Sequence, residues 1–339
     1  MSYYGLDRPH TPQYYLFYKA VFVFVLLGAV GLMLFATTSV EYTWRWYRVP
    51  QYFWATGQTE VRTDLEGTVA FVRQSGDGVT LGIAPLSSPD EPAEMALPEN
   101  AHIRVNEGDD VYMGDIVADV SYSKPGILLE GLWITMEVSA FAIILGIGVG
   151  IFTGLCRIAD NPALRWGAIT YIEIIRGSPL LVQIFLWYFV AGYLIDGILQ
   201  RMGMSPLPPL WYGVIALAIF TGAYVAEIVR AGIQSVHRGQ MEAARSLGMT
   251  HSQAMRKVIL PQAFRRIMPP LAGQFISLIK DSSLLGVMAV RELTKATREA
   301  VTSSLQSLEL WFTCALLYLV LTFTLSLFVQ YLETRAVRR

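Results

Sequence analysis

The stretch EAARSLGMTHSQAMRKVILPQ, residues 242–262, is polar and basic, although it lies between two long apolar segments. The surrounding loop, residues 236–266, holds one acidic residue and six basic ones, which are Arg238, Arg245, Arg256, Lys257, Arg265 and Arg266. Charged side chains are costly at membrane depth, so a segment of this composition belongs at an aqueous face. It is therefore predicted to form a loop between two membrane helices.

Two short helices are predicted within residues 237–268. In the first, Ala243 and Ala244 are small and leave a helix face that another protein can approach closely. Gly248 can adopt a positive φ and end this helix, Thr250 is placed to cap the next one, and Pro261 marks the turn toward the membrane. This helical pair suits the cleft of a partner protein, and its charge suits the surface of an anionic membrane equally well.

Six apolar segments are long enough to cross a bilayer, which requires about 20 residues per helix. Apolar residues make up 53% of the 339-residue chain and charged residues only 16%. Because lipid offers the backbone no hydrogen-bond partners, each segment is predicted to be helical. The predicted fold class is an all-α polytopic membrane protein with about six transmembrane helices, at residues 16–36, 131–156, 175–196, 208–229, 267–290 and 310–331.

The distribution of Lys and Arg sets the orientation, since these residues favour the cytoplasmic side. If the spans alternate, the two termini and the loop 236–266 lie on one side, and that side carries the basic excess. Both termini are therefore predicted to be cytoplasmic. The first apolar segment follows residues 1–15, which have little positive charge, and lacks a small-residue cleavage site, so we expect a retained anchor.

Residues 41–126 are too polar for lipid and too numerous for a simple loop. Short alternating runs broken by Gly, Pro and Asp, such as GTVAFVRQ and GVTLGIAP, predict β-strands. We therefore expect three parts: residues 1–40 with the N-terminus and first span, a small extracytoplasmic β-domain at 41–126, and a five-helix core at 127–339. The role of the β-domain is open, and contact with a partner protein is one hypothesis.

The run NEGDDVYMGDIVADV, residues 106–120, resembles a hairpin of barrel-sandwich domains of the lipoyl and biotinyl type. Lys124 lies near the place where such a domain carries its modified lysine. An alternative is therefore a membrane-anchored carrier protein. We favour a β-domain without a cofactor, because the segment is predicted to lie outside the cytoplasm, away from lipoylating enzymes.

Catalytic and cofactor motifs are missing from the sequence. It contains no GxxxxGK[ST], GxGxxG, HExxH or GxSxG pattern. The two cysteines, Cys156 and Cys314, lie in separate apolar segments, and the four histidines are scattered without metal-ligand spacing. We therefore expect no enzyme activity, no metal site and no cofactor on this chain.

The loop resembles the EAA loop of ABC-importer membrane subunits, whose pattern is EAA, three residues, Gly, nine residues, Ile, one residue, Leu-Pro. Val258 stands where the pattern has Ile. Neighbouring segments, among them IEIIRGSPLLVQIFLWYF and GAYVAEIVRAGIQSVHRGQ, resemble the polar amino acid uptake branch with its histidine-, glutamine- and glutamate-type permeases. The likeness covers about residues 130–335. The matching residues are Glu242, Ala243, Ala244, Gly248, Leu260 and Pro261.

This resemblance implies a type I ABC importer permease fold in a bacterial inner membrane, with residues 237–268 coupling to partner subunits. Two ATP-binding cassette subunits would bind ATP and Mg, and an extracytoplasmic solute-binding protein would deliver the amino acid. A second permease subunit, identical or homologous, would complete the pathway. The substrate could instead be an amino acid derivative such as an opine. A membrane channel is the alternative from another class, and it leaves the EAA loop unexplained.

Polar residues inside the predicted spans are candidates for the substrate pathway. Lys280 and Asp281 are adjacent in the fifth span, with Ser277 one turn away and Gln274 two turns away. They could hold the charged groups of an amino acid, although a structural ion pair or a helix break is slightly favoured. Tyr224 and Glu227 are further candidates in the fourth span, where a Glu227–Arg230 pair of purely structural value is equally possible.

Two further patterns are read mainly as architecture. Glu173 and Arg176 are spaced to form a same-face ion pair, and with Ser178 they lie at a membrane edge, where lining a gate is the alternative. Gly146, Gly150 and Gly154 recur every four residues, which predicts close packing against another helix.

Overall fold

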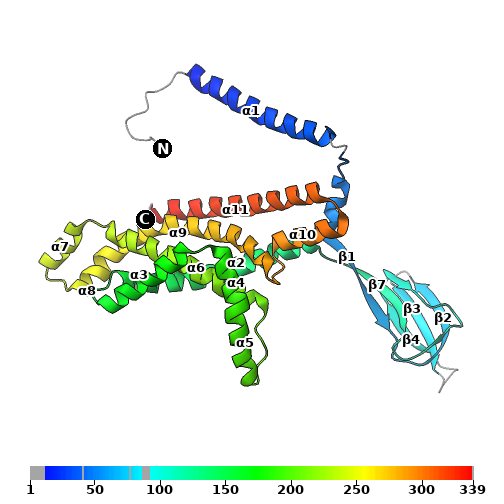
Figure 1. The fold of residues 1–339 in the computed structure, drawn as a ribbon. Coiled ribbons are helices and arrows are strands. Elements are labelled where there is room, and N and C mark those ends of the chain that lie inside the picture. The colour runs from blue at the N-terminus through cyan, green and yellow to red at the C-terminus, as the bar shows by residue number, and fades with distance from the viewer. Residues whose placement is uncertain (1–11, 40–41, 76–77, 86–91, 338–339) are drawn as a thin grey trace. The chain divides into compact units, whose positions relative to one another are not determined.

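The computed structural model describes residues 12–39, 42–75, 78–85 and 92–337 (Figure 1). The chain divides into two compact units, Met1–Trp46 and Tyr47–Arg339. The first unit contains α1 (Pro12–Ser39), a 28-residue helix whose side chains are almost all exposed. Exposed apolar side chains along a helix of this length fit a lipid environment.

The second unit begins within a 3₁₀ helix, η1 (Trp46–Tyr52), whose first residue closes the first unit, and continues with a two-sheet β-domain. One sheet has the strand order β1-β7-β5 and the other has β4-β3-β2-β6, with antiparallel pairing throughout. The strands are β1 (Trp54–Arg62), β2 (Gly67–Ser75), β3 (Gly78–Pro85), β4 (Ala93–Leu97), β5 (Ala101–Ile103), β6 (Asp110–Val111) and β7 (Ile116–Pro125).

The β-domain has its own core because alternate side chains of the strands point inward. Val69, Leu81 and Ile83 of one sheet pack in one cluster with Val117 of the other. Lys124, the candidate carrier lysine, is the second-last residue of β7 and is paired with Ala55 of β1. A side chain held in a paired strand is poorly placed to swing a cofactor, so this position does not favour the carrier alternative.

The rest of the second unit is helical. It contains long helices joined by short ones and by 3₁₀ or π-helical turns (Figure 1). The elements are α2 (Ile127–Arg157), α3 (Pro162–Gly177), α4 (Leu180–Phe185), η2 (Leu186–Ala191), α5 (Gly192–Arg201), α6 (Pro209–Gln234), α7 (Arg238–Ser246), α8 (His251–Ala254), η3 (Met255–Ile259), α9 (Leu260–Asp281), η4 (Ser282–Val287), α10 (Leu293–Ser304) and α11 (Ser307–Val337).

The predicted packing role of the spaced glycines is confirmed at the centre of this helical part. Gly146, Gly150 and Gly154 on α2 face Thr221, Val225 and Val229 on α6, respectively. A Cβ atom added to any of the three would press on the α6 side chain opposite, and on Gly150 it would overlap Val225. The helices α2 and α6 can therefore approach closely because α2 lacks side chains along this stripe.

Five helical segments within the described residues are long and apolar enough to cross a membrane. They are Pro12–Ser39, Ile127–Arg157, Leu180–Arg201, Pro209–Gln234 and Ser307–Tyr331. The third starts later than the predicted residue 175, because α3 ends at Gly177 and Pro179 caps α4. The predicted span at 267–290 is not among the five, since α9 ends at Asp281 and carries Arg265 and Arg266 just before the predicted range, which leaves too short an apolar stretch.

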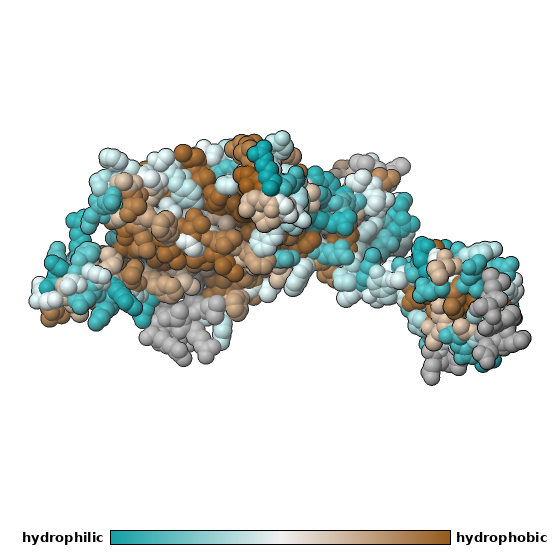
Figure 2. Space-filling view, turned by 90° about the horizontal axis from the view of Figure 1, so that it is seen from below, coloured by the Kyte–Doolittle hydropathy of each residue, from teal (hydrophilic) through white to brown (hydrophobic). Residues whose placement is uncertain are grey.

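The surface of the helical part reflects these compositions. Figure 2 shows hydrophobic residues across its middle and hydrophilic residues at the end that carries α7 and α8. Phe152, Trp166 and Phe189 are among its large exposed apolar side chains. An apolar surface of this extent is typical of a protein that faces lipid or another apolar partner.

Candidate functional site

The candidate coupling loop begins with α7, whose ends are fixed by local hydrogen bonds. His237 Nδ1 accepts a hydrogen bond from the Gly239 amide at 3.1 Å. At the other end Gly248 has φ +82°, as predicted, and the Met249 amide donates to the Ala244 carbonyl at 3.2 Å. This left-handed glycine ends the helix and reverses the chain.

The two alanines of the EAA pattern lie on different faces of α7. Ala244 is buried, whereas Ala243 and Glu242 are exposed. The prediction that both alanines form one smooth outer face was therefore wrong, because adjacent residues on a helix point about 100° apart. Ala243 belongs to the accessible face and Ala244 to the inner one.

The second half of the loop starts with a capping box, so the prediction for Thr250 is confirmed. Thr250 Oγ1 accepts from the Gln253 amide at 3.3 Å, and Gln253 Oε1 accepts from the Thr250 amide at 2.9 Å. These reciprocal bonds satisfy amides that a helix start leaves free. The start of α8 is therefore fixed at Thr250, two residues after Gly248.

The chain does not turn at Pro261, contrary to the prediction. α8 continues through the π-helical turn η3 into α9, and Pro261 lies in the first turn of α9 beside Leu260. A π turn tolerates a proline because the helical hydrogen-bond ladder is already interrupted there. The segment from α8 to α9 is therefore one continuous helical stretch.

The loop is anchored on α6 by an apolar cluster. Val229, Ile233 and Val236 pack with Ile259 and Ala263. In addition, Gln262 Nε2 donates to Gln240 Oε1 at 3.2 Å, which links the two halves of the loop. The loop is therefore packed on both α6 and the start of α9.

Leu247 lies at the tip of this loop and is 80% exposed. The sequence analysis did not single it out, although its place just before the helix-ending Gly248 was a usable signal. A large apolar side chain presented at the tip of a polar loop suits insertion into a cleft of another protein.

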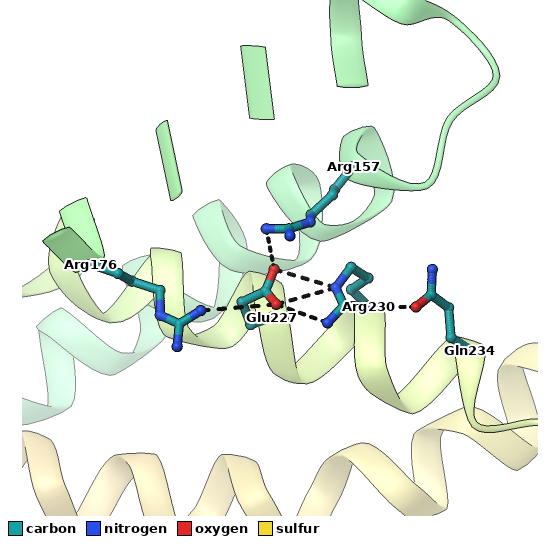
Figure 3. A network of polar contacts seen from close by, with 5 residues as sticks. All are labelled: Arg157, Arg176, Glu227, Arg230 and Gln234. Carbon is teal, nitrogen blue, oxygen red and sulfur yellow. Dashed lines mark hydrogen bonds and ion pairs between the residues drawn. The ribbon is translucent and has the colours of Figure 1, made fainter. Parts of the chain in front are cut away.

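A second cluster joins α2, α3 and α6 around Glu227, as Figure 3 shows. Arg230 Nη2 lies 2.9 Å from Glu227 Oε2, Arg176 Nη1 lies 3.9 Å from the same oxygen, and Arg157 Nη1 contacts Glu227 Oε1. Arg230 also donates to Gln234 Oε1 at 2.5 Å. We call Arg157, Arg176, Glu227 and Arg230 the Glu227 cluster.

The predicted Glu227–Arg230 pair is confirmed, but Arg176 does not pair with Glu173. Instead Arg176 reaches Glu227 and lies over the Tyr224 ring, 5.3 Å from its centroid. Glu173 is exposed and forms no ion pair within the part of the chain that the structure describes. Arg157 was missed by the sequence analysis, although a lone Arg closing an apolar helix was a signal that it needs a partner.

Ser178 lies at the joint between α3 and α4. Its Oγ donates to the Ile174 carbonyl at 2.9 Å, and Gln183 Nε2 donates to Ser178 Oγ at 2.9 Å and to the Ile175 carbonyl at 2.7 Å. These bonds satisfy carbonyls at the end of α3, so they support the architectural interpretation of this segment.

The fifth-span candidates lie along the second half of α9. Gln274, Ser277 and Asp281 follow the i, i+3, i+7 spacing of one helix face and are partly buried. Lys280 is exposed and lines a pocket of about 270 Å³ with Tyr318 of α11. Within the described residues Lys280 and Asp281 form no ion pair, and the predicted helix break is present, because α9 ends at Asp281.

The two groups of pathway candidates are not brought into one pocket. The Tyr224 ring lies tilted against the Phe220 ring, with centroids 4.9 Å apart, and Glu227 lines a pocket distinct from the one at Lys280. The candidates on α6 and those on α9 therefore stay two separate sets within this chain.

Glu292, which the sequence analysis did not single out, is fully buried at the start of α10. Its carboxylate accepts from the amides of Thr294 and Lys295 at 2.7 and 2.8 Å and from the Tyr318 hydroxyl at 3.0 Å. Burial raises the pKa of this carboxyl, and the hydrogen bonds oppose that shift. Glu292 thus joins α10 to α11 through a satisfied network.

A bundle of membrane-length helices with a polar two-helix loop at one end is typical of a transport subunit of a membrane. The chain belongs to the family described as binding-protein-dependent transport system inner membrane components, which it matches over residues 146–338. Its fold is the type I ABC importer permease fold, with several apolar helices. α1 and the β-domain lie outside the family match.

Individual relatives agree with the family match. The chain is 41% identical over 210 residues to "Probable glutamine ABC transporter permease protein GlnM" of Bacillus subtilis, covering 61% of this chain and 92% of that protein. It is 35% identical over 209 residues to "Glutamine transport system permease protein GlnP" of Escherichia coli K12, covering 62% and 92%. A solved amino acid ABC transporter with histidines aligns with TM-score 0.55 and 40% identity, covering 62% and 94%.

Proposed function

We propose that this chain is the membrane-spanning permease subunit of a binding-protein-dependent ABC importer that moves polar amino acids into the cytoplasm. The observation that carries the proposal is the 237–268 loop, a capped helical pair with an exposed apolar tip, rigidly joined to two core helices. The names of the relatives support the amino acid class, since they include glutamine, cystine and glutamate/aspartate permeases. An amino acid derivative such as an opine would fit the same class.

The proposed topology has six spans in a bacterial inner membrane, with both termini and the coupling loop in the cytoplasm. α9 serves as the fifth span despite its polar residues, because it packs against α6 and α11, which shield its polar face from lipid. Residues 1–40 hold the first span, residues 41–126 form the extracytoplasmic β-domain, and residues 127–339 form the permease core.

The proposed partners follow from this topology. Two copies of an ATP-binding cassette subunit, which bind ATP and Mg, would each hold a coupling loop, and an extracytoplasmic solute-binding protein would deliver the substrate. A second permease subunit, homologous or identical, would supply the other half of the pathway. The chain itself would carry no catalytic residue and no metal.

The proposed mechanism is mechanical coupling. Closure of the ATP-binding subunits would shift the loop, and the cluster around Ile259 and Val229 would pass that shift to α6 and α9. Glu242, Ala243 and Gly248 would set the fit to the partner. Ala244, Leu260 and Pro261 would fix the loop to the membrane helices from its inner side.

The proposed pathway residues lie on α6 and α9, which the loop moves directly. They are Lys280, Asp281, Gln274, Ser277, Tyr224 and Glu227. Arg176, Ser178 and the exposed Glu173 would shape the gate at the end of α3. To test this proposal, Lys280 and Asp281 are replaced in variants that still assemble and keep basal ATPase activity. If the dependence of ATPase activity on substrate is unchanged in both variants, these two residues do not belong to the pathway.

The experiment that tests the proposed function is purification of the tagged chain from its host in a mild detergent. We expect an ATP-binding subunit to accompany it, with ATPase activity raised by one class in a panel of amino acids. Leu247→Asp places a charge on the loop tip and should reduce the accompanying subunit about thirtyfold, the effect of losing an anchor worth about 2 kcal/mol.

Leu305→Asp is the matched control. Leu305 is a leucine 87% exposed outside the loop, and its left-handed backbone tolerates Asp. It should retain the ATP-binding subunit. If no ATP-binding subunit accompanies the unaltered chain, the coupling interpretation is wrong and a channel becomes the better account.

A further inference from the structure

A pocket of about 510 Å³ opens beside the Glu227 cluster. Arg176 from α3, Glu227 and Arg230 from α6, and Arg266 from α9 line it, together with the backbone around Ser235 and Pro270. Pockets of this size accommodate small molecules. Three guanidinium groups from three different helices thus line a single pocket.

The charge around this pocket is unbalanced. The pocket-lining residues and the Glu227 cluster together contain four arginines and one acidic residue, Glu227, which leaves a net charge of +3 (4 − 1). The arginines are Arg157, Arg176, Arg230 and Arg266. Gln234, which accepts from Arg230, is neutral and offsets none of this charge. Like charges at the edge of a low-dielectric region repel strongly, and a bound anion relieves that repulsion.

The guanidinium groups also have donors available for a ligand. Arg266 Nη1 donates to the Ser235 carbonyl, which uses one of its five N–H donors and holds it at the C-terminal end of α6. The Arg176 side chain is 43% exposed, and its Nη1 lies 3.9 Å from Glu227 Oε2. This distance is longer than a hydrogen bond, so the N–H groups of Arg176 that face Glu227 are only weakly engaged. Arg157 is the most enclosed of the cluster arginines and supports Glu227 from the opposite side.

We propose that this pocket binds one oxyanion group, a carboxylate or a phosphate, through Arg176, Arg230 and Arg266. Arginine is suited to this role because its planar fork binds two oxygens of a carboxylate or phosphate at once. Glu227 holds Arg230 and Arg176 at the pocket wall. The same chemistry is offered by the carboxylate of an amino acid, the headgroup of an anionic lipid and free phosphate.

The test measures binding of small anions to the purified full-length chain in neutral detergent. The readout is the thermal unfolding midpoint of the chain, at a constant ionic strength that is set with sodium chloride. The probes are inorganic phosphate, L-glutamine, L-glutaminamide, which lacks the α-carboxylate, and a short-chain phosphatidylglycerol. At tenfold excess over its dissociation constant, at least one oxyanion probe should raise the midpoint by about 2 °C, the shift that binding of this strength gives a chain of 339 residues.

Arg266→Gln should require about tenfold more of that probe for the same shift, and Arg176→Gln provides a second test if the first variant folds poorly. Arg265→Gln is the matched control, because Arg265 is exposed and does not line the pocket. A shift with L-glutamine but not its amide assigns the carboxylate, a shift with phosphate assigns the free ion, and a shift with the lipid alone assigns the headgroup.

The proposal is overturned if no probe raises the unfolding midpoint more than sodium chloride does at the same ionic strength. It is also overturned if Arg265→Gln weakens binding as much as Arg266→Gln. Binding is measured without ATP and without partner subunits. A negative result therefore leaves the proposed transport function standing, and a failure of transport leaves the anion site standing.

Discussion

At the scale of single residues, Glu227 is the acid on which three helices converge. Its two carboxylate oxygens form ion pairs with Arg230 from its own helix, Arg157 from the end of α2 and Arg176 from the end of α3. The side chains of Glu227 and Arg157 are less than a fifth exposed, so solvent screens their interaction only in part. One carboxylate therefore holds together helix ends that would otherwise repel.

Glu227→Gln is expected to lower the free energy of unfolding by about 2 kcal/mol. It leaves the arginines without their counter-charge, and removing one partner of a partly buried ion pair strands the other. Thermal unfolding in detergent measures the loss. Glu173→Gln is the control, because Glu173 is exposed and should change stability by less than about 0.5 kcal/mol. Equal effects of the two substitutions would contradict the role given to Glu227.

At the scale of elements, the contact between α2 and α6 depends on an absence of side chains. Gly150 faces Val225 and the carbonyl of Gly222, with no room for a Cβ atom. Gly148, two residues earlier on the same helix, faces open space. The spacing of four residues places the glycine stripe on one face, which is why α6 can approach α2 closely along that face.

Gly150→Leu is expected to destabilise the chain by about 2–3 kcal/mol, because the new side chain must displace α6 or its valine. Gly148→Leu should be neutral or slightly stabilising, since leucine favours a helix more than glycine does and nothing opposes it there. The thermal unfolding midpoints of the two variants, measured under the same conditions, test whether the cost of a side chain depends on its contact with α6. A similar loss in both would mean that the cost is one of helix formation and not of packing.

At the scale of the whole molecule, the β-domain is an insertion with adjacent ends. The Gly126 amide donates to the Phe53 carbonyl at 2.7 Å, and β1 pairs with β7 along its full length. Tyr52 and Phe53 also pack against an apolar cluster that contains Leu128 and Leu293. The strands can therefore be removed without separating the points at which the chain enters and leaves the helical part.

Replacing residues 54–125 by a linker of about four residues should leave the helical part folded and still able to bind its ATP-binding subunit. If the partner that the β-domain contacts is the solute-binding protein, stimulation of ATPase activity by that protein should fall at least about tenfold while basal activity remains. The comparison is made in reconstituted membranes. Full stimulation of the shortened chain would remove this role from the β-domain.

Sequence alone determined the features that depend on a few consecutive residues or on a regular spacing. The positive φ of Gly248, the Thr250 cap and the packing face of the glycines on α2 follow from backbone freedom, side-chain reach and helical periodicity. The resemblance of the EAA pattern likewise predicted the family, and the match over residues 146–338 confirmed it.

Only the tertiary structure decided which charged residues meet and where the helices are interrupted. Arg157 and Glu227 lie 70 residues apart (227 − 157), and no local signal distinguishes Arg176–Glu227 from the nearer Arg176–Glu173 pair. The continuity of α8 into α9 through a π turn at Pro261 likewise escaped prediction. The physical reason is the same in both cases: long-range packing fixes the ends of the helices, and side chains and turns then adjust to the geometry that packing leaves.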